Sequence, residues 1–556
     1  MTGEVVLSGP LFFEMVRGGA GRLANNRAVV NDLNVFPIPD GDTGDNMYMT
    51  IDSGAGAVKS GEKYDLNSVS EQIARGMLLG ARGNSGVILS RIFAGIAKGF
   101  EGVESADVRT LGEALEHGVK EAYGAVSQPV EGTILTVFRE AVSYANGRIG
   151  EDTDLLRYFE DFTGELQRSL LRTPELLSVL KEAGVVDSGG AGLVYIAEGM
   201  KNVLNGEIEE GQMEAAPQSG KKAPDFSKFN EDSVLEFGYC TEFLLQLQRA
   251  KTDVDHFDVA GLTDWLNGIG DSVVCFAEGS VIKVHVHTTE PGVVLNHCQE
   301  FGEFLTLKIE NMTLQHSEAK IENRYTPEMP ALKRARKKFG IAAVANGEGV
   351  KETFRSSGVD YVVEGGQSMN PSTEDFLRAF DEINADTIFV FPNNGNVILT
   401  AKQAAELYDK SDVRVIGTKD IGQGYAGVSM LDSSIGDADE MVREVEEVIS
   451  QVVTGGVSKA VRDTEKDGVA IVKGDYLGFV GDTVYTDQKT AFDAAIELTE
   501  KLDAGKRDVM FLICGADAPE NEARGLYDEL SKRFRRTEII MIDGGQPIYD
   551  YLIVLE

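Results

Sequence analysis

The chain has 556 residues, 42% of them hydrophobic, and a formal net charge of −37 at pH 7. This length exceeds what one hydrophobic core supports, so three or four folding units are expected. The negative charge argues against nucleic-acid binding and against adsorption to anionic membranes, because both need concentrated positive charge. With no long apolar run, no signal peptide and no Cys-x-x-Cys pair among four cysteines, the sequence predicts a cytoplasmic protein without a disulfide framework or stable membrane insertion.

The first long segment, residues 1–205, is expected to be almost entirely helical. Apolar residues recur there at helical spacing, for example at Met47, Ile51 and Ala55. Residues 206–230 are polar, contain two prolines and have no apolar period. We interpret them as a linker.

The rest of the chain changes to strand patterns. Residues 231–318 contain the alternating segment IKVHVHT and are expected to form a small α+β domain, followed by a second linker over 319–338. Apolar strands then alternate with helices over 339–556, which predicts an α/β domain with mainly parallel pairing. The tripeptide Gly-Gly-Gln occurs there at 365–367 and 544–546, either by chance or as equivalent loops of two related subdomains.

The segment PDGDTGDN is the strongest local signal. It places Asp40, Asp42 and Asp45 within six residues, separated by Gly41 and Gly44. Carboxylates this close repel one another unless a cation lies among them, and Mg²⁺ prefers such oxygen ligands. The alternative is a solvated acidic turn.

Four helix starts in the first segment have a similar construction, rich in Gly, Ser, Thr and Asp. They are GDTGDN, GARGNSG, EGT and VVDSGGAG, at 41–46, 80–86, 131–133 and 185–192. Helix N-termini carry unpaired amides and partial positive charge, and therefore attract phosphate. The four together predict a metal–nucleotide site at one end of a helical bundle, although the chain has neither a Walker loop nor the protein-kinase glycine-rich loop.

A second candidate metal site lies in the middle domain. His285 and His287 alternate on an expected strand, so they share one face, and Cys240 is a candidate third ligand with His316 or Glu242 as the fourth. Cysteine and histidine together favour Zn²⁺. A half-buried histidine pair with ordinary hydrogen bonds is the alternative.

The motifs NVFPIPDGDTGDNM, GARGNSGVILS, EGTILTV and GVVDSGGAGL resemble, in order and spacing, the DhaL-type nucleotide-binding domain of dihydroxyacetone kinases. The whole chain resembles the bacterial fatty acid kinase family FakA. This resemblance implies an all-α DhaL-like helical bundle, a small α+β middle domain and an α/β domain similar to DegV and FakB. It also implies an ATP-dependent kinase that phosphorylates the carboxylate of a fatty acid bound to a FakB-type carrier, giving acyl phosphate for phospholipid synthesis.

The resemblance also assigns residues. It makes Asp40, Asp42 and Asp45 the catalytic ligands of two Mg²⁺ ions. It also favours the zinc interpretation of Cys240 and the two histidines, with a structural role for the zinc. The expected ATP contacts are Thr43, Asn46, Gly83, Asn84, Ser85, Gly86, Gly132, Thr133, Arg172 and Asp187. An ordinary exposed helix arginine is the alternative for Arg172.

Two other functions remain open from the sequence. One is a kinase of a small polyol or ketose, although no substrate-binding histidine domain is visible in the chain. The other is a nucleotide-gated lipid sensor without turnover. In the favoured interpretation the C-terminal domain docks the carrier and forms a homodimer.

Overall fold

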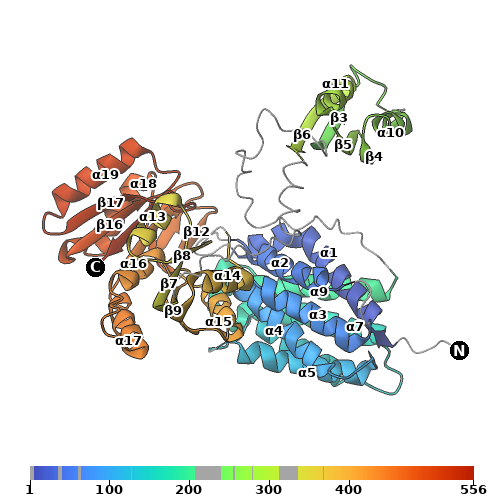
Figure 1. Ribbon diagram of the computed structural model, residues 1–556, viewed down its shortest axis with the longest axis horizontal. Coiled ribbons are helices and arrows are strands. Elements are labelled where there is room, and N and C mark those ends of the chain that lie inside the picture. Colours follow the sequence, from blue (N-terminus) through green and yellow to red (C-terminus); the bar gives the residue numbers. More distant parts are fainter. Residues whose placement is uncertain are drawn as a thin grey trace. The chain divides into compact units, whose positions relative to one another are not determined.

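The computed structural model of the protein describes most of the chain, in two compact units: Met1–Ala216 with Arg334–Glu556, and Pro217–Lys333 (Figure 1). The residues described are 6–34, 41–59, 64–126, 128–206, 239–254, 257–278, 280–311, 336–366 and 369–556. Both predicted linkers lie almost wholly outside these ranges. No helix among the described residues combines the length and the apolar character needed to cross a bilayer.

The first unit begins with a helical domain, as predicted. Its helices are α1 (Gly9–Leu33), α2 (Thr43–Gly56), α3 (Leu66–Gly80), α4 (Gly83–Gly99), α5 (Val108–Gly124), α6 (Ile134–Asn146), α7 (Leu155–Leu176), α8 (Ser178–Ala183) and α9 (Ser188–Leu204). Within its described part, the one departure from an all-helical pattern is a two-residue antiparallel pair, β1 (Leu7–Ser8) with β2 (Ser105–Ala106). Three helices, α2, α4 and α9, begin inside their glycine-containing motifs rather than after them.

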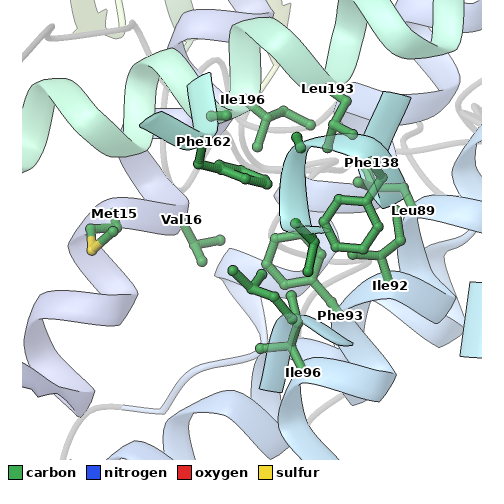
Figure 2. Packing of buried hydrophobic residues seen from close by; sticks show 14 of the residues in the cluster. Met15, Val16, Leu89, Ile92, Phe93, Ile96, Phe138, Phe162, Leu193 and Ile196 are labelled. Atoms are coloured by element: carbon green, nitrogen blue, oxygen red, sulfur yellow. The ribbon is translucent and has the colours of Figure 1, made fainter. Parts of the chain in front are cut away.

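One apolar core holds this domain together. Side chains from α1, α4, α6, α7 and α9 meet in it, and Figure 2 shows Phe93, Phe138 and Phe162 pointing toward one another from different helices. Phe138 and Phe162 pack edge to face with ring centroids 6.2 Å apart. Aromatic contacts of this kind stabilise beyond the area that they bury, so the helix ends are positioned by a rigid interior.

The middle unit is a four-stranded antiparallel sheet with two helices, which confirms the α+β prediction. Its sheet order is β4-β5-β3-β6. The elements are β3 (Tyr239–Leu247), α10 (Val259–Asn267), β4 (Asp271–Glu278), β5 (Val281–Thr288), α11 (Pro291–Gln299) and β6 (Gly302–Asn311). Phe243, Leu245, Val284 and Val286 lie in its core.

The C-terminal domain begins with a parallel sheet of order β10-β9-β7-β8. Its first strand starts at Lys337, two residues before the predicted boundary, because the lysine-rich end of the linker already pairs with β9. The elements are β7 (Lys337–Ala345), α13 (Glu348–Ser356), β8 (Tyr361–Glu364), α14 (Thr373–Ile383), β9 (Ala385–Phe391), α15 (Ile398–Leu407), β10 (Asp412–Val415), α16 (Ile421–Ser429) and α17 (Ala438–Ile449).

The second C-terminal sheet, of order β15-β14-β11-β18-β16-β17, corrects the prediction of mainly parallel pairing. Only β16 and β17 pair in parallel in this sheet. β14 and β15 form a hairpin, β11 pairs antiparallel with β14, and β18 lies antiparallel between β11 and β16. The elements are β11 (Val453–Lys459), β12 (Thr464–Lys466), β13 (Val469–Ile471), β14 (Tyr476–Val480), β15 (Thr483–Gln488), α18 (Ala491–Lys501), a 3₁₀ turn (Ala504–Lys506), β16 (Val509–Cys514), α19 (Glu520–Arg533), β17 (Glu538–Asp543) and β18 (Tyr551–Leu555).

A cavity of about 320 Å³ lies in this C-terminal domain, between residues of the two sheets. Its walls include the apolar side chains of Val344, Val452, Phe479 and Leu552. Both Gly-Gly-Gln loops contribute to it, the first through its two glycines and the second through Gln546. The repeated tripeptide therefore marks two loops that face one space, which supports the subdomain interpretation over chance.

Candidate functional site

Four helix starts converge at one end of the helical domain. Short connections between neighbouring helices reverse the chain direction, so α2, α4, α6 and α9 begin at the same end. Ser188 Oγ at the start of α9 donates to Thr43 Oγ1 at the start of α2, with 3.3 Å between the oxygens. The predicted convergence is confirmed, and we call the starts of these four helices the open end.

Four other helix starts form what we call the capped end, at α1, α3, α5 and α7, apart from the short α8. Each begins with a side-chain oxygen that accepts a hydrogen bond from the first turn, supplied by Ser8, Asp65, Asp107 and Asp154. At the open end, α2, α4 and α6 have no such bond from their own N-cap residue. The first-turn amides of α4 are thus offered to an outside acceptor, which is how helix termini bind anions. At α6 the Ile134 amide donates to Asp187 instead.

Two of the three predicted magnesium aspartates are described, whereas Asp40 lies outside the described residues. Asp42 precedes α2, and its Oδ2 accepts a 2.6 Å hydrogen bond from Asn370 Nδ2 of the C-terminal domain. Asp45, in the first turn of α2, accepts from Asn31 Nδ2 at 2.7 Å and lies 3.4 Å from Arg27 Nη1. Both carboxylates are therefore held in fixed positions by donors.

The turn between α3 and α4 approaches α2 closely. Gly83 has φ +56°, and a Cβ at this position would lie 2.7 Å from Asn46 Nδ2. A Cβ on Gly86 would lie 2.4 Å from Thr50 Oγ1. Both glycines are required sterically, and Gly83 also by its backbone conformation. Asn46 is buried beside this turn, while Ser85 is half-buried.

Asn84 and Thr133 occupy the remaining uncapped starts. Asn84 Nδ2 donates to Asn396 Oδ1 at 3.2 Å, and its buried Oδ1 has no partner among the described residues. Thr133 Oγ1 donates to the Val130 carbonyl at 2.8 Å instead of capping α6. Gly132 has φ +84°, and its amide donates to Thr136 Oγ1 at 2.8 Å.

Asp187 is the one N-cap of the open end that does cap its helix. Its Oδ2 accepts from the Gly190 amide at 2.7 Å. Burial raises the pKa of this carboxyl to about 6, against the lowering effect of hydrogen bonds from the Gly190 and Ile134 amides. An acid with this shift among unpaired helix termini is typical of a functional site.

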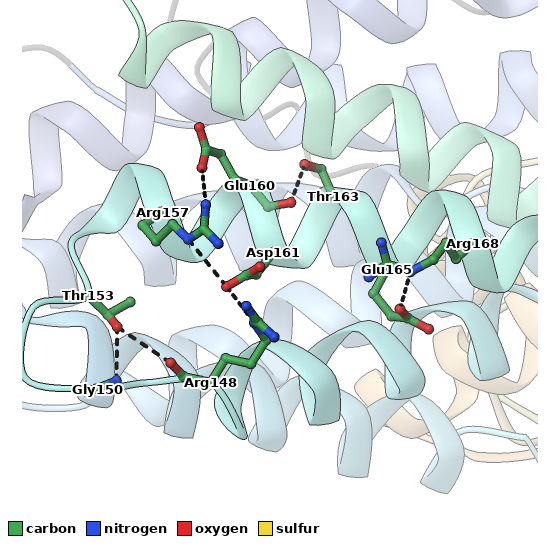
Figure 3. Close-up of polar contacts among 9 residues, drawn as sticks. All are labelled: Arg148, Gly150, Thr153, Arg157, Glu160, Asp161, Thr163, Glu165 and Arg168. Atoms are coloured by element: carbon green, nitrogen blue, oxygen red, sulfur yellow. Dashed lines mark hydrogen bonds and ion pairs between the residues drawn. The ribbon is translucent and has the colours of Figure 1, made fainter.

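Arg172 belongs to an ionic network on the surface of the helical domain. Its Nη2 lies 2.7 Å from Glu140 Oε2 and 2.8 Å from Glu165 Oε1. Figure 3 shows Glu165 also engaged by Arg168, next to the neighbouring cluster of Arg157 and Asp161. The structure thus presents Arg172 in the ordinary role of a helix arginine, and its contact with ATP stays a prediction.

In the middle unit, strand register brings the predicted zinc residues together. Cys240 is opposite His287 and Glu242 is opposite His285 in the antiparallel pair of β3 and β5. These four positions alternate with the core residues of both strands, so they share the other face of the sheet. Their side chains and the whole of His316 lie outside what the structure describes.

Among the described residues, no group of three or more His, Cys, Asp or Glu side chains is arranged to hold a metal ion. The oxygen atoms at the open end are nevertheless of the kind that Mg²⁺ takes as ligands. Asp42 and Asp45 supply carboxylate oxygens, and Asn84 supplies a buried amide oxygen that lacks a partner within the described part of the chain. Hard oxygen donors of this kind, completed by phosphate oxygens, are what Mg²⁺ binds.

Three further residues at this site are not marked by any motif in the sequence. Asn31 Oδ1 accepts from the Gly44 and Asp45 amides at 2.7 and 3.3 Å, and so caps α2 from a different helix. Arg27, one turn earlier on α1, reaches the same aspartate. Asn370 lies 328 residues from Asp42, and no local pattern indicates its role.

The chain matches three protein-family models over nearly its whole described length. Residues 37–202 match the DAK2 domain, residues 236–319 the middle domain of FakA-like fatty acid kinase proteins, and residues 340–556 their C-terminal domain. Protein YloV of Bacillus subtilis is 39% identical over 559 residues, covering 99% of each chain. An uncharacterized protein of Staphylococcus aureus strain MRSA252, SAR1202, is 35% identical over 554 residues with the same coverage.

Solved structures are each similar to a part of the chain. DegV from Bacillus subtilis, a fatty acid binding protein, matches 39% of this chain and 99% of its own at 12% identity with a TM-score of 0.31. Dihydroxyacetone kinase from C. freundii, solved with AMP-PNP and Mg²⁺, matches 35% of this chain and 34% of its own at 19% identity with a TM-score of 0.28.

Fold and family matches together define a multidomain protein of kinase-related type, with a DAK2 helical domain followed by middle and α/β domains. More particularly, the chain belongs to the FakA-like fatty acid kinase family, together with YloV.

Proposed function

We propose that this protein is the ATP-dependent kinase component of a fatty acid kinase. Its substrate would be the carboxylate of a fatty acid held by a separate FakB-type carrier, and its product an acyl phosphate for phospholipid synthesis. ATP with two Mg²⁺ ions would bind at the open end, on Asp40, Asp42 and Asp45. Family membership supports the kinase and fatty acid parts of this proposal.

The reaction fits a site made of amides and carboxylates. A carboxylate oxygen of the fatty acid attacks the γ-phosphorus of ATP, the bond from that phosphorus to the β–γ bridging oxygen breaks, and ADP leaves. Carboxylic acids are ionised at neutral pH, so no proton has to be removed from the nucleophile. Positioning and charge compensation are then the main demands on the protein.

The observation that carries the proposal is the difference in helix capping. The starts of α2, α4 and α6 lack a cap from their own N-cap residue, and they converge with Asp42, Asp45 and Asp187. Asn31 caps α2 from another helix and the Ile134 amide of α6 donates to Asp187, so the first-turn amides of α4 are the ones offered to an anionic phosphate. The aspartates require the cations that accompany ATP.

Chemical trapping of the product tests the proposal. The protein is incubated with MgATP and a carrier loaded with fatty acid, and hydroxylamine is added. An acyl phosphate gives a fatty hydroxamate detectable by mass spectrometry, whereas a sugar phosphate does not react. Phosphorylation of dihydroxyacetone or glycerol, with no hydroxamate formed, would instead favour the polyol or ketose kinase.

We assign the C-terminal domain to carrier docking and homodimer formation. It is the part that matches the C-terminal domain of FakA-like fatty acid kinase proteins over residues 340–556. Analytical ultracentrifugation of the full chain, alone and with loaded carrier, tests both points. A monomer that forms no complex with the carrier would contradict them.

We also propose a structural Zn²⁺ in the middle unit, supported by the shared face of Cys240, Glu242, His285 and His287. Untagged protein should contain about one zinc per chain, and His285→Ala should lose it and melt at lower temperature, because metal binding is coupled to folding. His297→Ala is the matched control, since the His297 ring stacks on Trp265 with centroids 3.8 Å apart instead. Fully stable protein without zinc would refute the site.

The C-terminal cavity favours a second candidate function, that of a lipid sensor gated by nucleotide. Its volume of about 320 Å³ and its apolar walls fall in the range of small-molecule sites. A fluorescent fatty acid that binds the protein without a carrier, and that Val344→Trp excludes, would support this function. ATP turnover only with a loaded carrier, and no direct lipid binding, would remove it.

A further inference from the structure

Residues of the C-terminal domain contact the open end through what we call the seam. At its inner part, Asn370 Nδ2 donates to Asp42 Oδ2 at 2.6 Å, and Arg82 Nη1 donates to the Asn370 carbonyl at 2.8 Å. Close by, the Thr373 amide donates to the Ala81 carbonyl at 3.2 Å. The start of α14 is therefore attached to the turn between α3 and α4.

The outer part of the seam joins α4 to α15. Arg91 Nε donates to Gln403 Oε1 at 2.9 Å, and Arg91 Nη2 lies 2.5 Å from Glu406 Oε2. Gln403 Nε2 in turn donates to the Leu78 carbonyl at 2.9 Å. Gln403 is buried, and its Nε2 also donates to Thr373 Oγ1 at 3.2 Å, which connects the outer part of the seam with the inner part. Arg91, Gln403 and Glu406 are not among the proposed metal ligands, so they can be changed without removing one.

Polar groups in the inner seam are incompletely satisfied. Asn370 is only 2% exposed. Asn370 Oδ1 and Asn84 Oδ1 are buried without a partner among the described residues. A buried polar atom without a partner is costly, because water would have satisfied it. The closed seam is therefore a contact that a competing ligand can displace.

Two seam residues also belong to the proposed nucleotide site. A cation bound to Asp42 Oδ2 would lie about 2.1 Å from this oxygen. Asn370 Nδ2 already lies 2.6 Å from the same oxygen and directs a hydrogen toward it. Asn84 likewise uses its Nδ2 on Asn396 rather than on a phosphate. The amide donor and the cation draw on the electron pairs of the same carboxylate oxygen, so each weakens the interaction of the other with it.

We propose that the closed seam and Mg·nucleotide exclude each other, so that the C-terminal domain acts as an internal competitor at the open end. This inference rests on the proposed function for its nucleotide site. Binding of Mg·nucleotide releases Asn370 and opens the seam, and opening the seam strengthens nucleotide binding. The two effects are necessarily equal, because coupling between sites is reciprocal.

Hydrogen exchange on the unmodified full chain tests the opening directly. The Thr373 amide donates across the seam, so peptides covering the start of α14 should exchange faster when Mg·ADP is added. Peptides from α17, which does not touch the seam, serve as the reference within the same sample. Unchanged or slower exchange at α14, with Mg·ADP bound, would overturn the inference.

Calorimetric titration with Mg·ADP tests the reciprocal effect. Gln403→Ala with Glu406→Ala should tighten binding at least about fivefold, the lower range of allosteric coupling. Lys402→Ala is the matched control on the same helix, because Lys402 is exposed there, and it should leave affinity unchanged. Equal affinities in all three proteins would overturn the inference.

A covalent bond across the seam would keep it closed and should have the opposite effect on nucleotide binding. The pair Arg91→Cys and Gln403→Cys, oxidised to a disulfide, should weaken Mg·ADP binding at least about fivefold, with recovery on reduction. Unaltered binding by the oxidised form would contradict the competition. If wild-type protein does not bind Mg·ADP, the proposed function is wrong. If it binds Mg·ADP with an affinity that none of the seam variants changes, only the inference about the seam is wrong.

Discussion

At the capped end of the helical domain, Ser8, Asp65, Asp107 and Asp154 each satisfy an amide of the helix that follows. At the open end, Asp42 and Thr133 occupy the same N-cap position and are residue types suited to capping, yet neither makes the bond. One domain therefore uses the same residues in two ways. The comparison teaches that residue types suited to capping bond their own helix at the capped end, whereas Asp42 and Thr133 turn to other partners at the open end.

The largest effect should come from removing Asp42. Asp42→Ala should lower phosphoryl transfer by about 10³-fold, since phosphate charge would be left uncompensated in the transition state. The fold should persist, because this side chain does not cap α2. Turnover with loaded carrier and thermal melting measure the two parts. Asp52→Ala, on the same helix, is the control with retained turnover, and near-normal turnover of Asp42→Ala in saturating Mg²⁺ would refute the assignment.

Gly83→Ala should have the next largest effect. It would combine the strain of a left-handed conformation, about 1–2 kcal/mol, with a clash against Asn46. Gly102→Ala is a matched control, since Gly102 has φ +74° but nothing within 4 Å of the added Cβ. Both variants should lose stability on denaturant unfolding, but only Gly83→Ala should lose Mg·ADP binding, by about tenfold or more. Equal binding losses would break the comparison.

Asp187→Asn should change the pH dependence of stability. The folded-state pKa of about 6 exceeds the ordinary aspartate value of about 3.9, so the wild-type free energy of unfolding falls as pH rises between these values. Asparagine keeps the cap without the charge. The variant should match wild type below about pH 4 and exceed it by about 2–3 kcal/mol above pH 6. Thermal melts across this range measure the difference.

Asp107→Asn is the control with the opposite sign. The hydrogen bond from the Thr110 amide lowers the pKa of this exposed N-cap carboxyl. Its ionised form stabilises the fold, and that contribution is lost as pH falls through the lowered pKa. The variant should therefore be less stable than wild type at pH 7 and equal to it in acid. If Asp187→Asn and Asp107→Asn changed the free energy of unfolding at pH 7 in the same direction, the distinction between the two ends would be removed.

The smallest effect is expected at the capped end. Asp65→Ala removes the 2.8 Å bond from the Ser68 amide and should cost about 1 kcal/mol of stability. Turnover and Mg·ADP affinity should stay as in wild type, because this helix start takes no part in the proposed site. A loss of turnover at unchanged stability would place chemistry at both ends.

Much of this site could be predicted because its residue types are required locally. Glycine at position 83 is required by the conformation of its own turn, and the motifs indicate where helices start to within a few residues. Asn31 and Asn370 could not be found in this way, because they reach the aspartates from other elements. The second C-terminal sheet was expected to be parallel, since strand and helix patterns alternate there, but pairing depends on the order in which distant strands assemble.

The paired Gly-Gly-Gln loops have a consequence for how the cavity of the C-terminal domain can change. β7, α13 and β8 lead to the first loop, and β16, α19 and β17 lead to the second, each through parallel neighbouring strands. The halves also interlock, because the Val350 amide of the first donates to the Gly544 carbonyl of the second at 3.2 Å. The two βαβ segments therefore both contribute to the lining of one cavity, so a substitution in either loop can change the shape of the space that both loops face.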